Sequence, residues 1–272
     1  MKKLLFSLTL LIALILAACG NDVETASGAE EDKMISLIIF DNPAYVDATE
    51  IAKEEALKLG YTLDVTYLND IVQPNEAVNA KEKFGNWFQH VAYLNQYNAD
   101  HKGDLVPTFD IFTDVAGLYS TKIKSIKELQ ENAVVAIPVD PSNNGRALFM
   151  LQNLGLLKLK EGISVTEASL LDVVENPLNI QFKEVDQLML SRMINDVDLA
   201  FIFASTLSAG ELDDAVPIIV ENVEEVSDYM ESIAIHKDNI DDPKVEILRQ
   251  AFQNDRVKAS FEKNFPNVIL GW

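Results

Sequence analysis

The sequence contains few of the residues from which metal sites and many catalytic sites are built. Its 272 residues include one cysteine and three histidines. A disulfide bond within the chain is therefore excluded, and a histidine-rich metal site is poorly supported because its ligands normally recur at short spacings. The chain also lacks the G-x-S-x-G, G-x-G-x-x-G, P-loop and H-E-x-x-H motifs. We therefore expect no enzyme activity, no cofactor and no metal.

Basic residues are scarce relative to acidic ones. Lysine and arginine together number 22 and aspartate and glutamate 43, which gives a net charge of −21. Such a surface repels nucleic acid and anionic lipid head groups. Nucleic acid is therefore not an expected partner, and an anionic ligand would need a specific local binding site.

Only the N-terminus carries a long apolar run. Residues 4–16 are apolar apart from Ser7 and Thr9, two lysines precede them, and Leu-Ala-Ala-Cys follows, ending at Cys19. The run is short for a transmembrane helix but suits an export signal. The Leu-Ala-Ala-Cys sequence resembles the lipobox of bacterial lipoproteins, in which the peptidase cuts before the cysteine and the cysteine receives lipid. We predict that residues 1–18 are a signal peptide and that Cys19 is lipidated; a plain secretory signal is the alternative.

Residues 19–33 are polar and acidic and contain no large apolar side chain after Val23. This composition is typical of a flexible tether. We therefore expect a protein that is lipid-anchored at the cell membrane and faces outside the cytoplasm. Its folded body is expected to start near Met34.

From residue 34 onwards, short apolar runs alternate with helical patterns. The opening order of strand, helix and strand predicts a parallel pair and an α/β class. Strands are predicted at 34–40, 61–68, 133–138, 179–185, 198–204 and 232–237. Helices are predicted at 47–60, 125–128, 146–157, 186–196 and, as a pair, within 241–265.

The aromatic segment GNWFQHVAYLNQYN, residues 85–98, is the first candidate for a ligand site. If the segment is one helix, Asn86, His90, Tyr93 and Tyr97 fall on one stripe. Their side chains combine apolar bodies with polar tips, which suits a pocket that packs an apolar group and also offers hydrogen bonds. Packing between two lobes is the alternative interpretation.

The segment AIPVDPSNNGRAL, residues 136–148, is the second candidate. An apolar strand enters a loop, and Ser142 or Asn143 can cap a helix whose first turn contains Arg146. A cation there opposes the helix dipole, which costs a few tenths to about 1 kcal/mol. A ligand carboxylate bound by Arg146 and free N–H groups would explain it. An ion pair with Asp140 is the alternative.

These segments, taken in order, resemble the methionine-binding lipoprotein family of ABC importers, the NLPA-type lipoproteins. The resemblance covers residues 34–272. It is carried by the lipobox, VQPN (72–75), NWFQHVAYLNQYN (86–98), GLYS (117–120), AIPVDPSNNGRALFMLQNLGLLKLK (136–160), VVENPLNIQF (173–182) and DVDLAF (196–201).

The resemblance implies a two-lobed fold of the type II periplasmic-binding-protein kind, with a hinge. The lobes would be 34–116 plus 232–272, and 120–230, with crossings near 117–120 and 232–236. The implied ligand-binding residues are Phe88, His90, Tyr93, Asn143 and Arg146, with Arg146 binding a carboxylate. The implied partners are a small amino acid and the permease and ATPase of an ABC importer.

Two departures from the family pattern affect the ligand contacts. Ile71 stands where the family has a tyrosine, and Phe203 or Ser205 stands where it has an asparagine. The expected function is that of a substrate-binding component that delivers methionine or a related solute. A short methionine-type peptide or another small solute is the alternative. A metal-binding lipoprotein and an extracellular enzyme have less support.

Overall fold

The computed structural model describes residues 33–208, 212, 214–221, 229–265 and 268–272. The chain divides into two compact units, Met1–Met34 and Ile35–Trp272. The predicted signal peptide, Cys19 and nearly all of the tether lie outside the described residues. Within the described part, no helix has the length and apolar character needed to cross a membrane.

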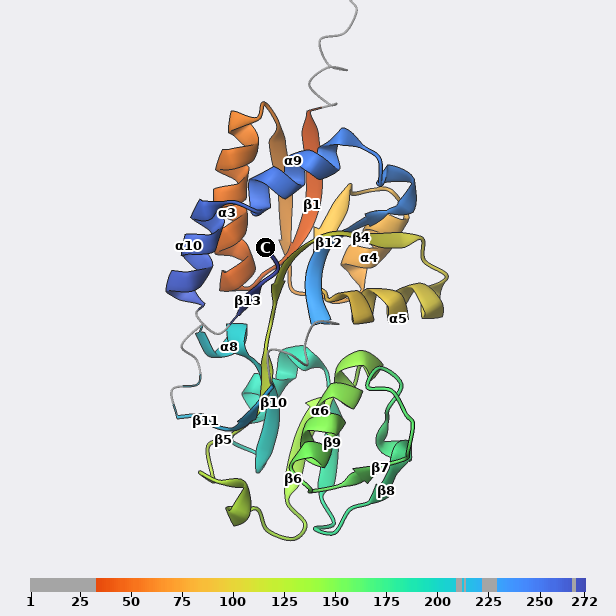
Figure 1. Cartoon of the computed structure of the whole chain (residues 1–272), viewed down its shortest axis with the longest axis vertical. Coiled ribbons are helices and arrows are strands. Elements are labelled where there is room, and N and C mark those ends of the chain that lie inside the picture. Colours follow the sequence, from red (N-terminus) through yellow and green to blue (C-terminus); the bar gives the residue numbers. More distant parts are fainter. Residues whose placement is uncertain (1–32, 209–211, 213, 222–228, 266–267) are drawn as a thin grey trace, which may run out of the picture. The chain divides into compact units, whose positions relative to one another are not determined.

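Two mixed β-sheets form the framework of the second unit (Figure 1). The first has the order β13-β4-β12-β3-β1-β2, and the second has the order β11-β5-β10-β6-β9. The first contains β1 (Met34–Phe40), β2 (Thr62–Leu68), β3 (Gly85–Trp87), β4 (Leu105–Thr113), β12 (Met230–His236) and β13 (Ile269–Leu270). The second contains β5 (Ala116–Ser120), β6 (Val134–Pro138), β9 (Gln181–Val185), β10 (Leu199–Phe203) and β11 (Val216–Val220).

The chain crosses from the first sheet to the second between β4 and β5, where only Asp114 and Val115 separate the strands. It returns between β11 and β12. In the first sheet β3 is parallel to β1, whereas β12 is antiparallel to both β3 and β4. In the second sheet β6 is parallel to β9 and β10, and β5 is antiparallel to β10. The two crossings bring distant parts of the sequence together.

Helices pack against both sheets (Figure 1). They include α3 (Pro43–Lys58), α4 (Gln73–Asn79), α5 (Val91–His101), α6 (Pro141–Asn153), α7 (Leu190–Met193), α8 (Ala204–Ser208), α9 (Pro243–Phe252) and α10 (Asp255–Asn264). Single turns of 3₁₀ helix lie at Ile126–Glu128, Leu170–Asp172, Gln187–Met189 and Lys237–Asn239. Strands β7 (Lys158–Leu159) and β8 (Val173–Glu175) pair antiparallel in a separate two-stranded sheet.

The first turn of α3 shows how local sequence defines a helix end. The Asn42 side chain accepts a hydrogen bond from the Ala44 N–H at 2.9 Å, and Pro43, which has no N–H to lose, is the first helical residue. Alanines then recur every fourth position, from Ala44 to Ala56, and all are buried. This narrow stripe lets α3 lie close to the apolar residues of the first sheet.

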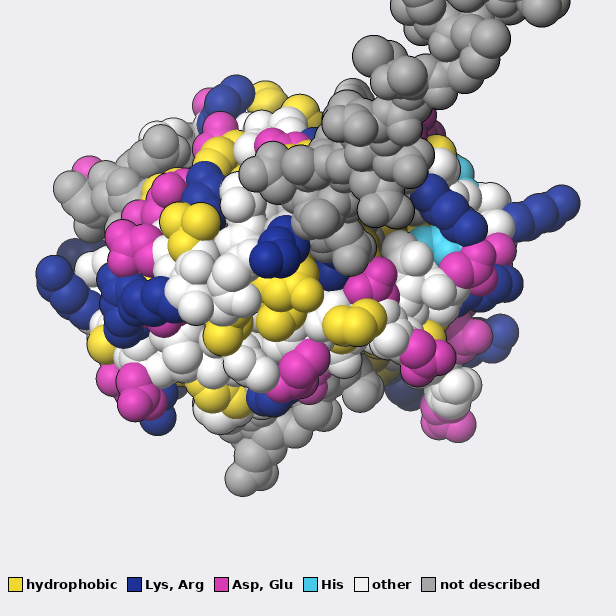
Figure 2. Space-filling view, turned by 90° about the horizontal axis from the view of Figure 1, so that it is seen from above, with side chains coloured by type: hydrophobic (Ala, Val, Ile, Leu, Met, Phe, Trp, Pro, Cys, Tyr) yellow, Lys and Arg dark blue, Asp and Glu magenta, His cyan; other side chains and the backbone are white. Residues whose placement is uncertain are grey.

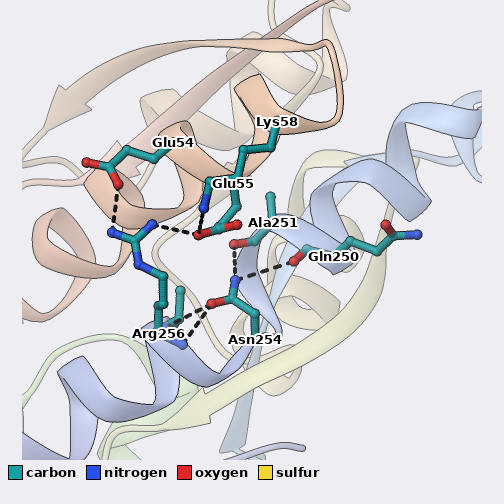
Figure 3. A network of polar contacts seen from close by, with 8 residues as sticks. Glu54, Glu55, Lys58, Gln250, Ala251, Asn254 and Arg256 are labelled. Atoms are coloured by element: carbon teal, nitrogen blue, oxygen red, sulfur yellow. Dashed lines mark hydrogen bonds and ion pairs between the residues drawn. The ribbon is translucent and has the colours of Figure 1, made fainter.

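Polar contacts connect α3 to α10 at the surface (Figure 3). Arg256 donates to Glu55 and to Glu54, each at 2.6 Å, and Lys58 reaches Glu55 at 2.8 Å. The Arg256 side chain is 48% exposed, so solvent screens these pairs and their contribution to stability is small.

Acidic and basic side chains are interspersed over the face shown in Figure 2. No broad basic patch interrupts this mixture in that view.

Most predicted elements are confirmed, with shifts at their ends. The strands predicted at 34–40 and 61–68 correspond to β1 and β2, and the strand predicted at 232–237 begins earlier, at Met230. The helix predicted at 186–196 is shorter, because a 3₁₀ turn at Gln187–Met189 precedes the brief α7.

One helix prediction is wrong. Residues 85–98 are not a single helix, because Gly85–Trp87 form β3 and the helix α5 begins only at Val91. Asn86 therefore does not share a helical stripe with His90. Its side chain donates to Asn75 and to the Pro74 carbonyl within a buried polar cluster.

Candidate ligand-binding site

A cavity of about 250 Å³ opens where elements of the two sheets meet. Its wall comes from the C-terminal end of β1, the first turn of α3, the start of α5, the β4–β5 crossing, α6, α7, β10 and β12. Among the lining residues are Tyr45, Phe88, His90, Tyr93, Asp114, Asn143, Leu188, Phe201, Phe203, Ser205 and Glu231. Apolar rings and a few polar groups thus converge on one space, as in small-molecule sites.

His90 caps α5 and is thereby oriented toward α6. Its Nδ1 accepts a hydrogen bond from the Tyr93 N–H at 3.0 Å, so the proton lies on Nε2. Nε2 then donates to Asn143 Oδ1 at 3.1 Å. Burial, and secondly the charge of Arg146, lower the His90 pKa to about 3. His90 is therefore a neutral hydrogen-bonding group at ordinary pH.

Asp140 caps the N-terminus of α6. Its Oδ1 accepts from the Asn143 N–H at 3.0 Å and from the Ser142 hydroxyl at 2.8 Å, and Pro141 is the first helical residue. The predicted cap at Ser142 or Asn143 is therefore wrong, because Pro141 suits the first helical position and the carboxylate before it caps better. Arg146 consequently lies in the second turn of α6, where the unfavourable dipole effect has largely decayed.

Arg146 is held by groups of the protein itself. Its Nε donates to Glu221 Oε1, its Nη2 donates to Glu221 Oε2 at 2.5 Å, and Nη2 also donates to the Asp114 carbonyl at 2.9 Å. The guanidinium carbon lies 4.1 Å from the centre of the Tyr229 ring and 5.7 Å from that of Phe203. The partner of Arg146 is thus Glu221, and not Asp140.

Two of the carboxylates that line the cavity are buried, those of Asp114 and Glu231. Asp114 accepts hydrogen bonds from the Ser205 N–H at 3.0 Å and the Ser205 hydroxyl at 2.5 Å. Glu231 accepts from the Tyr45 hydroxyl, which lies 2.7 and 2.6 Å from its two oxygens. Burial raises the Asp114 pKa to about 6. Burial, and secondly the charge of Asp114, raise the Glu231 pKa to about 8.

The structure brings most of the predicted site residues together. Phe88, His90, Tyr93, Asn143 and Ser205 all line the cavity. Arg146 lies behind this wall, with its side chain 2% exposed, and is not among the described lining residues.

The remaining residues of the aromatic segment, and the residues at the two departures from the family pattern, lie in different surroundings. Trp87 is buried in the core, with ring centres 4.7 Å from Tyr45 and 5.3 Å from Phe252. Tyr97 packs in a separate apolar cluster with Leu94 and stacks on His101. At the first of these departures, the backbone carbonyl of Ile71 accepts a hydrogen bond from the Tyr93 hydroxyl at 2.8 Å. Phe203 and Ser205 both line the cavity.

Sequence reasoning missed Asp114 and Glu231. Each is the only charged residue in a largely apolar run, Asp114 within 111–119 and Glu231 within 230–235. A carboxylate at such a position loses its hydration unless it has a specific partner. This pattern could have identified both residues, although it could not have shown that they line one cavity.

Metal-binding geometry is absent from the region that the structure describes. There, no group of three or more histidine, cysteine, aspartate or glutamate side chains could hold a metal ion. Among the described residues, the charged side chains that line the cavity are Asp41, Asp114 and Glu231, and the guanidinium of Arg192.

Comparison with known proteins identifies the family that this chain matches. The family model described as NlpA lipoprotein matches residues 39–270. D-methionine-binding lipoprotein MetQ of Salmonella typhi is 35% identical over 266 residues, which cover 96% of this chain and 94% of that protein.

Solved structures give the same result for the fold. A nutrient binding protein from Burkholderia cenocepacia bound to methionine has a TM-score of 0.81 at 31% identity, covering 88% of this chain and 100% of that one. An ABC transporter periplasmic substrate-binding protein from Coxiella burnetii has a TM-score of 0.80 at 30% identity, covering 87% and 100%. The expected α/β fold of the periplasmic-binding-protein type is confirmed.

Proposed function

The chain belongs to the NlpA lipoprotein family, and we propose that it is the substrate-binding component of an ABC importer for methionine or a related amino-acid-like solute. The observation that carries this proposal is the cavity that Phe88, His90, Tyr93, Asn143 and Ser205 line together. A relative bound to methionine and a relative that serves an ABC transporter support it. In this role the protein captures a solute and performs no chemical reaction on it.

In the proposed complex, the aromatic rings receive the apolar part of the solute. Phe88 and Tyr93 lie edge to face, with ring centres 5.9 Å apart, and form one side of the cavity. The neutral His90 and the amide of Asn143 are joined by a hydrogen bond and fix the polar side. Such a division into apolar packing and a few oriented polar groups is how small-molecule sites combine affinity with specificity.

The proposed role of Arg146 depends on its Nη1 nitrogen. Glu221 accepts from Nε and Nη2, and the Asp114 carbonyl accepts from Nη2. Among the described residues, Nη1 has one long hydrogen bond, to Asn143 Oδ1 at 3.5 Å. We propose that a ligand carboxylate binds beside Asn143 at Nη1, while the pair with Glu221 stays in place.

We propose that the body has two lobes, 34–116 plus 232–272 and 120–230, which close on the solute by a hinge motion. The two separate sheets and the short Asp114–Val115 crossing support this division. We further propose that lipid on Cys19 holds the protein at the outer face of the cell membrane, where it meets the permease and ATPase of the importer.

Identification of the bound solute tests the proposed function. The protein is purified under native conditions and denatured, and the released small molecules are identified by mass spectrometry. The emptied protein is then titrated with L-methionine, D-methionine, methionine dipeptides and other amino acids by calorimetry. We expect methionine or a close relative to bind most tightly. Absence of binding by every amino acid and dipeptide would exclude the proposed function.

A further inference from the structure

The segment that joins β4 to β5 is bonded to elements of the second sheet. The Asp114 carbonyl accepts a hydrogen bond from Arg146 Nη2 at 2.9 Å. The Asp114 carboxylate accepts from the Ser205 N–H at 3.0 Å and from the Ser205 hydroxyl at 2.5 Å. The Val115 carbonyl accepts from the Ala204 N–H at 2.8 Å. Because these donors belong to α6 and α8, the segment is fastened to the part of the molecule that carries the second sheet.

The Glu221 carboxylate fastens the same segment a second time. Its oxygens accept from Arg146 Nε and Nη2, and Oε2 also accepts from the Ala116 N–H at 2.8 Å. The backbone makes a further bond there, since the Glu221 N–H donates to the Ala116 carbonyl at 3.0 Å. One buried carboxylate, on the residue that follows β11, thus joins α6 to the start of β5.

Thr113, the last residue of β4, is held by the first sheet instead. It pairs with Met230 of β12 on one side and with Ile269 of β13 on the other. Its hydroxyl also donates to Met230 Sδ at 3.3 Å. The bonding of the chain therefore changes from one sheet to the other between Thr113 and Asp114. Two backbone torsions, ψ of Thr113 and φ of Asp114, lie between the two sets of bonds.

The orientation of the Arg146 guanidinium depends on Glu221. A guanidinium is planar, and a two-pronged pair with a carboxylate fixes its plane. The pair leaves Nη2 directed at the Asp114 carbonyl, and Nη1 lies 3.5 Å from Asn143 Oδ1. Removal of the Glu221 carboxylate therefore releases the guanidinium and the Ala116 N–H at the same point.

We propose that Glu221 is a positioning residue: it holds the Arg146 guanidinium against the β4–β5 segment, so that residues 114–116 move with the second lobe and the lobes turn at the Thr113–Asp114 link. This inference rests on the proposed function, in which two lobes close on a solute. It goes beyond that function because it assigns 114–116 to the second lobe and gives the Arg146–Glu221 pair a role in the hinge. A pair that served stability alone would leave the turning of the lobes unchanged.

The distance between two spin labels measures how far the lobes turn. The labels are attached to Leu57→Cys in α3 and to Leu171→Cys in the second lobe, where the native side chains are 61% and 96% exposed. The full chain also carries Cys19→Ala, which removes its only native cysteine, and is kept in detergent. Pulsed electron paramagnetic resonance on the ligand-free protein then gives the distribution of distances between the labels.

Glu221→Gln should widen this distribution about twofold, because bending then spreads from one link over residues 114–116. The double variant Arg146→Met with Glu221→Leu separates this effect from stability. It leaves neither charge of the pair, so its urea midpoint should return toward that of the wild type. Its distribution should nevertheless stay as wide as that of Glu221→Gln. Arg256→Ala is the control, because this arginine joins α10 to α3 within the first lobe, and its distribution should match the wild type.

The double variant decides the inference. If it is folded and its distribution is as narrow as that of the wild type, the pair serves stability alone and the inference is wrong. A folded Glu221→Gln protein with an unchanged distribution also overturns it. A double variant that does not fold shows that the pair is needed for the fold itself, and has the same consequence.

These measurements use the ligand-free protein, so they are independent of the test of the proposed function. Failure of every amino acid and dipeptide to bind would exclude that function. The widths of the distance distributions would still decide the role of Glu221. Conversely, unchanged widths would remove this role and leave the binding of a methionine-type solute as proposed.

Discussion

The guanidinium of Arg146 and the carboxylate of Glu221 form a two-pronged ion pair whose side chains are 2% and 8% exposed. The two residues are 75 positions apart in the sequence and belong to α6 and to the segment that follows β11. The pair neutralises the charge of Arg146 behind the cavity wall.

Arg146→Ala should lower the free energy of unfolding by about 3–5 kcal/mol, because Glu221 is left buried without its cation. The double variant Arg146→Met with Glu221→Leu should recover much of that loss, since no buried charge then remains. Urea denaturation at pH 7 measures both. Arg256→Ala is the matched control, because this exposed arginine also contacts two carboxylates (Figure 3). It should shift the midpoint far less, and an equal shift would contradict the argument.

The stability of the ligand-free protein should fall as the pH rises from 7 to 8. The pKa of Glu231 is raised to about 8 by burial and by Asp114, against about 4.3 in an unfolded chain. The folded form therefore holds a proton that the unfolded form has lost, and this contribution disappears as the pH passes the folded pKa. The expected slope is about 1 kcal/mol per pH unit.

Glu231→Gln should flatten this slope, because the amide does not titrate. Urea midpoints at pH 7 and pH 8 provide the measurement. Asp114 and His90 titrate mainly at lower pH, with folded pKa values of about 6 and about 3, and disturb this window little. The same slope in wild type and variant would show that Glu231 is ionised in the empty cavity.

Phe88→Ala should weaken methionine binding by about tenfold or more, because it removes part of the apolar wall. The loss should be smaller for alanine, which has little side chain to pack. Tyr97→Leu is the comparison, since Tyr97 belongs to the same aromatic segment but packs in another cluster. It should lower stability by about 1–3 kcal/mol and leave affinity unchanged. Calorimetry and urea denaturation separate the two effects, and reduced affinity in Tyr97→Leu would contradict the assignment.

Cys19→Ala should prevent lipidation, and the protein should then remain an unprocessed precursor or appear in the soluble fraction. Two or more acyl chains hold a protein at a membrane far better than the marginal binding of one. Membrane fractionation and the intact mass of the N-terminus give the result. Ser27→Ala, in the same tether, should be processed and anchored normally. A Cys19→Ala protein with a mature N-terminus that stays on the membrane would disprove the lipobox interpretation.

The sequence alone determined the features that depend on neighbouring residues. Apolar runs predicted β1, β6 and β10 nearly to the residue, because a buried strand needs a continuous apolar stretch, and alternating side chains predicted the half-exposed β2. The ordered family motifs led to Phe88, His90, Tyr93, Asn143 and Ser205, all of which line the cavity. The starts of α3 and α6 were within reach too, since Asn42-Pro43 and Asp140-Pro141 are local capping signals.

Only the tertiary structure decided which charges meet. Glu221 reaches Arg146 across 75 positions, and Glu231 reaches Tyr45 across 186. No periodicity or spacing encodes such pairs, because the crossings between the two sheets, and not the sequence neighbours, bring these side chains together. Sequence could suggest that Arg146 needs an anion. Whether that anion is a ligand or Glu221 depends on the folded positions of groups that lie far apart in the chain.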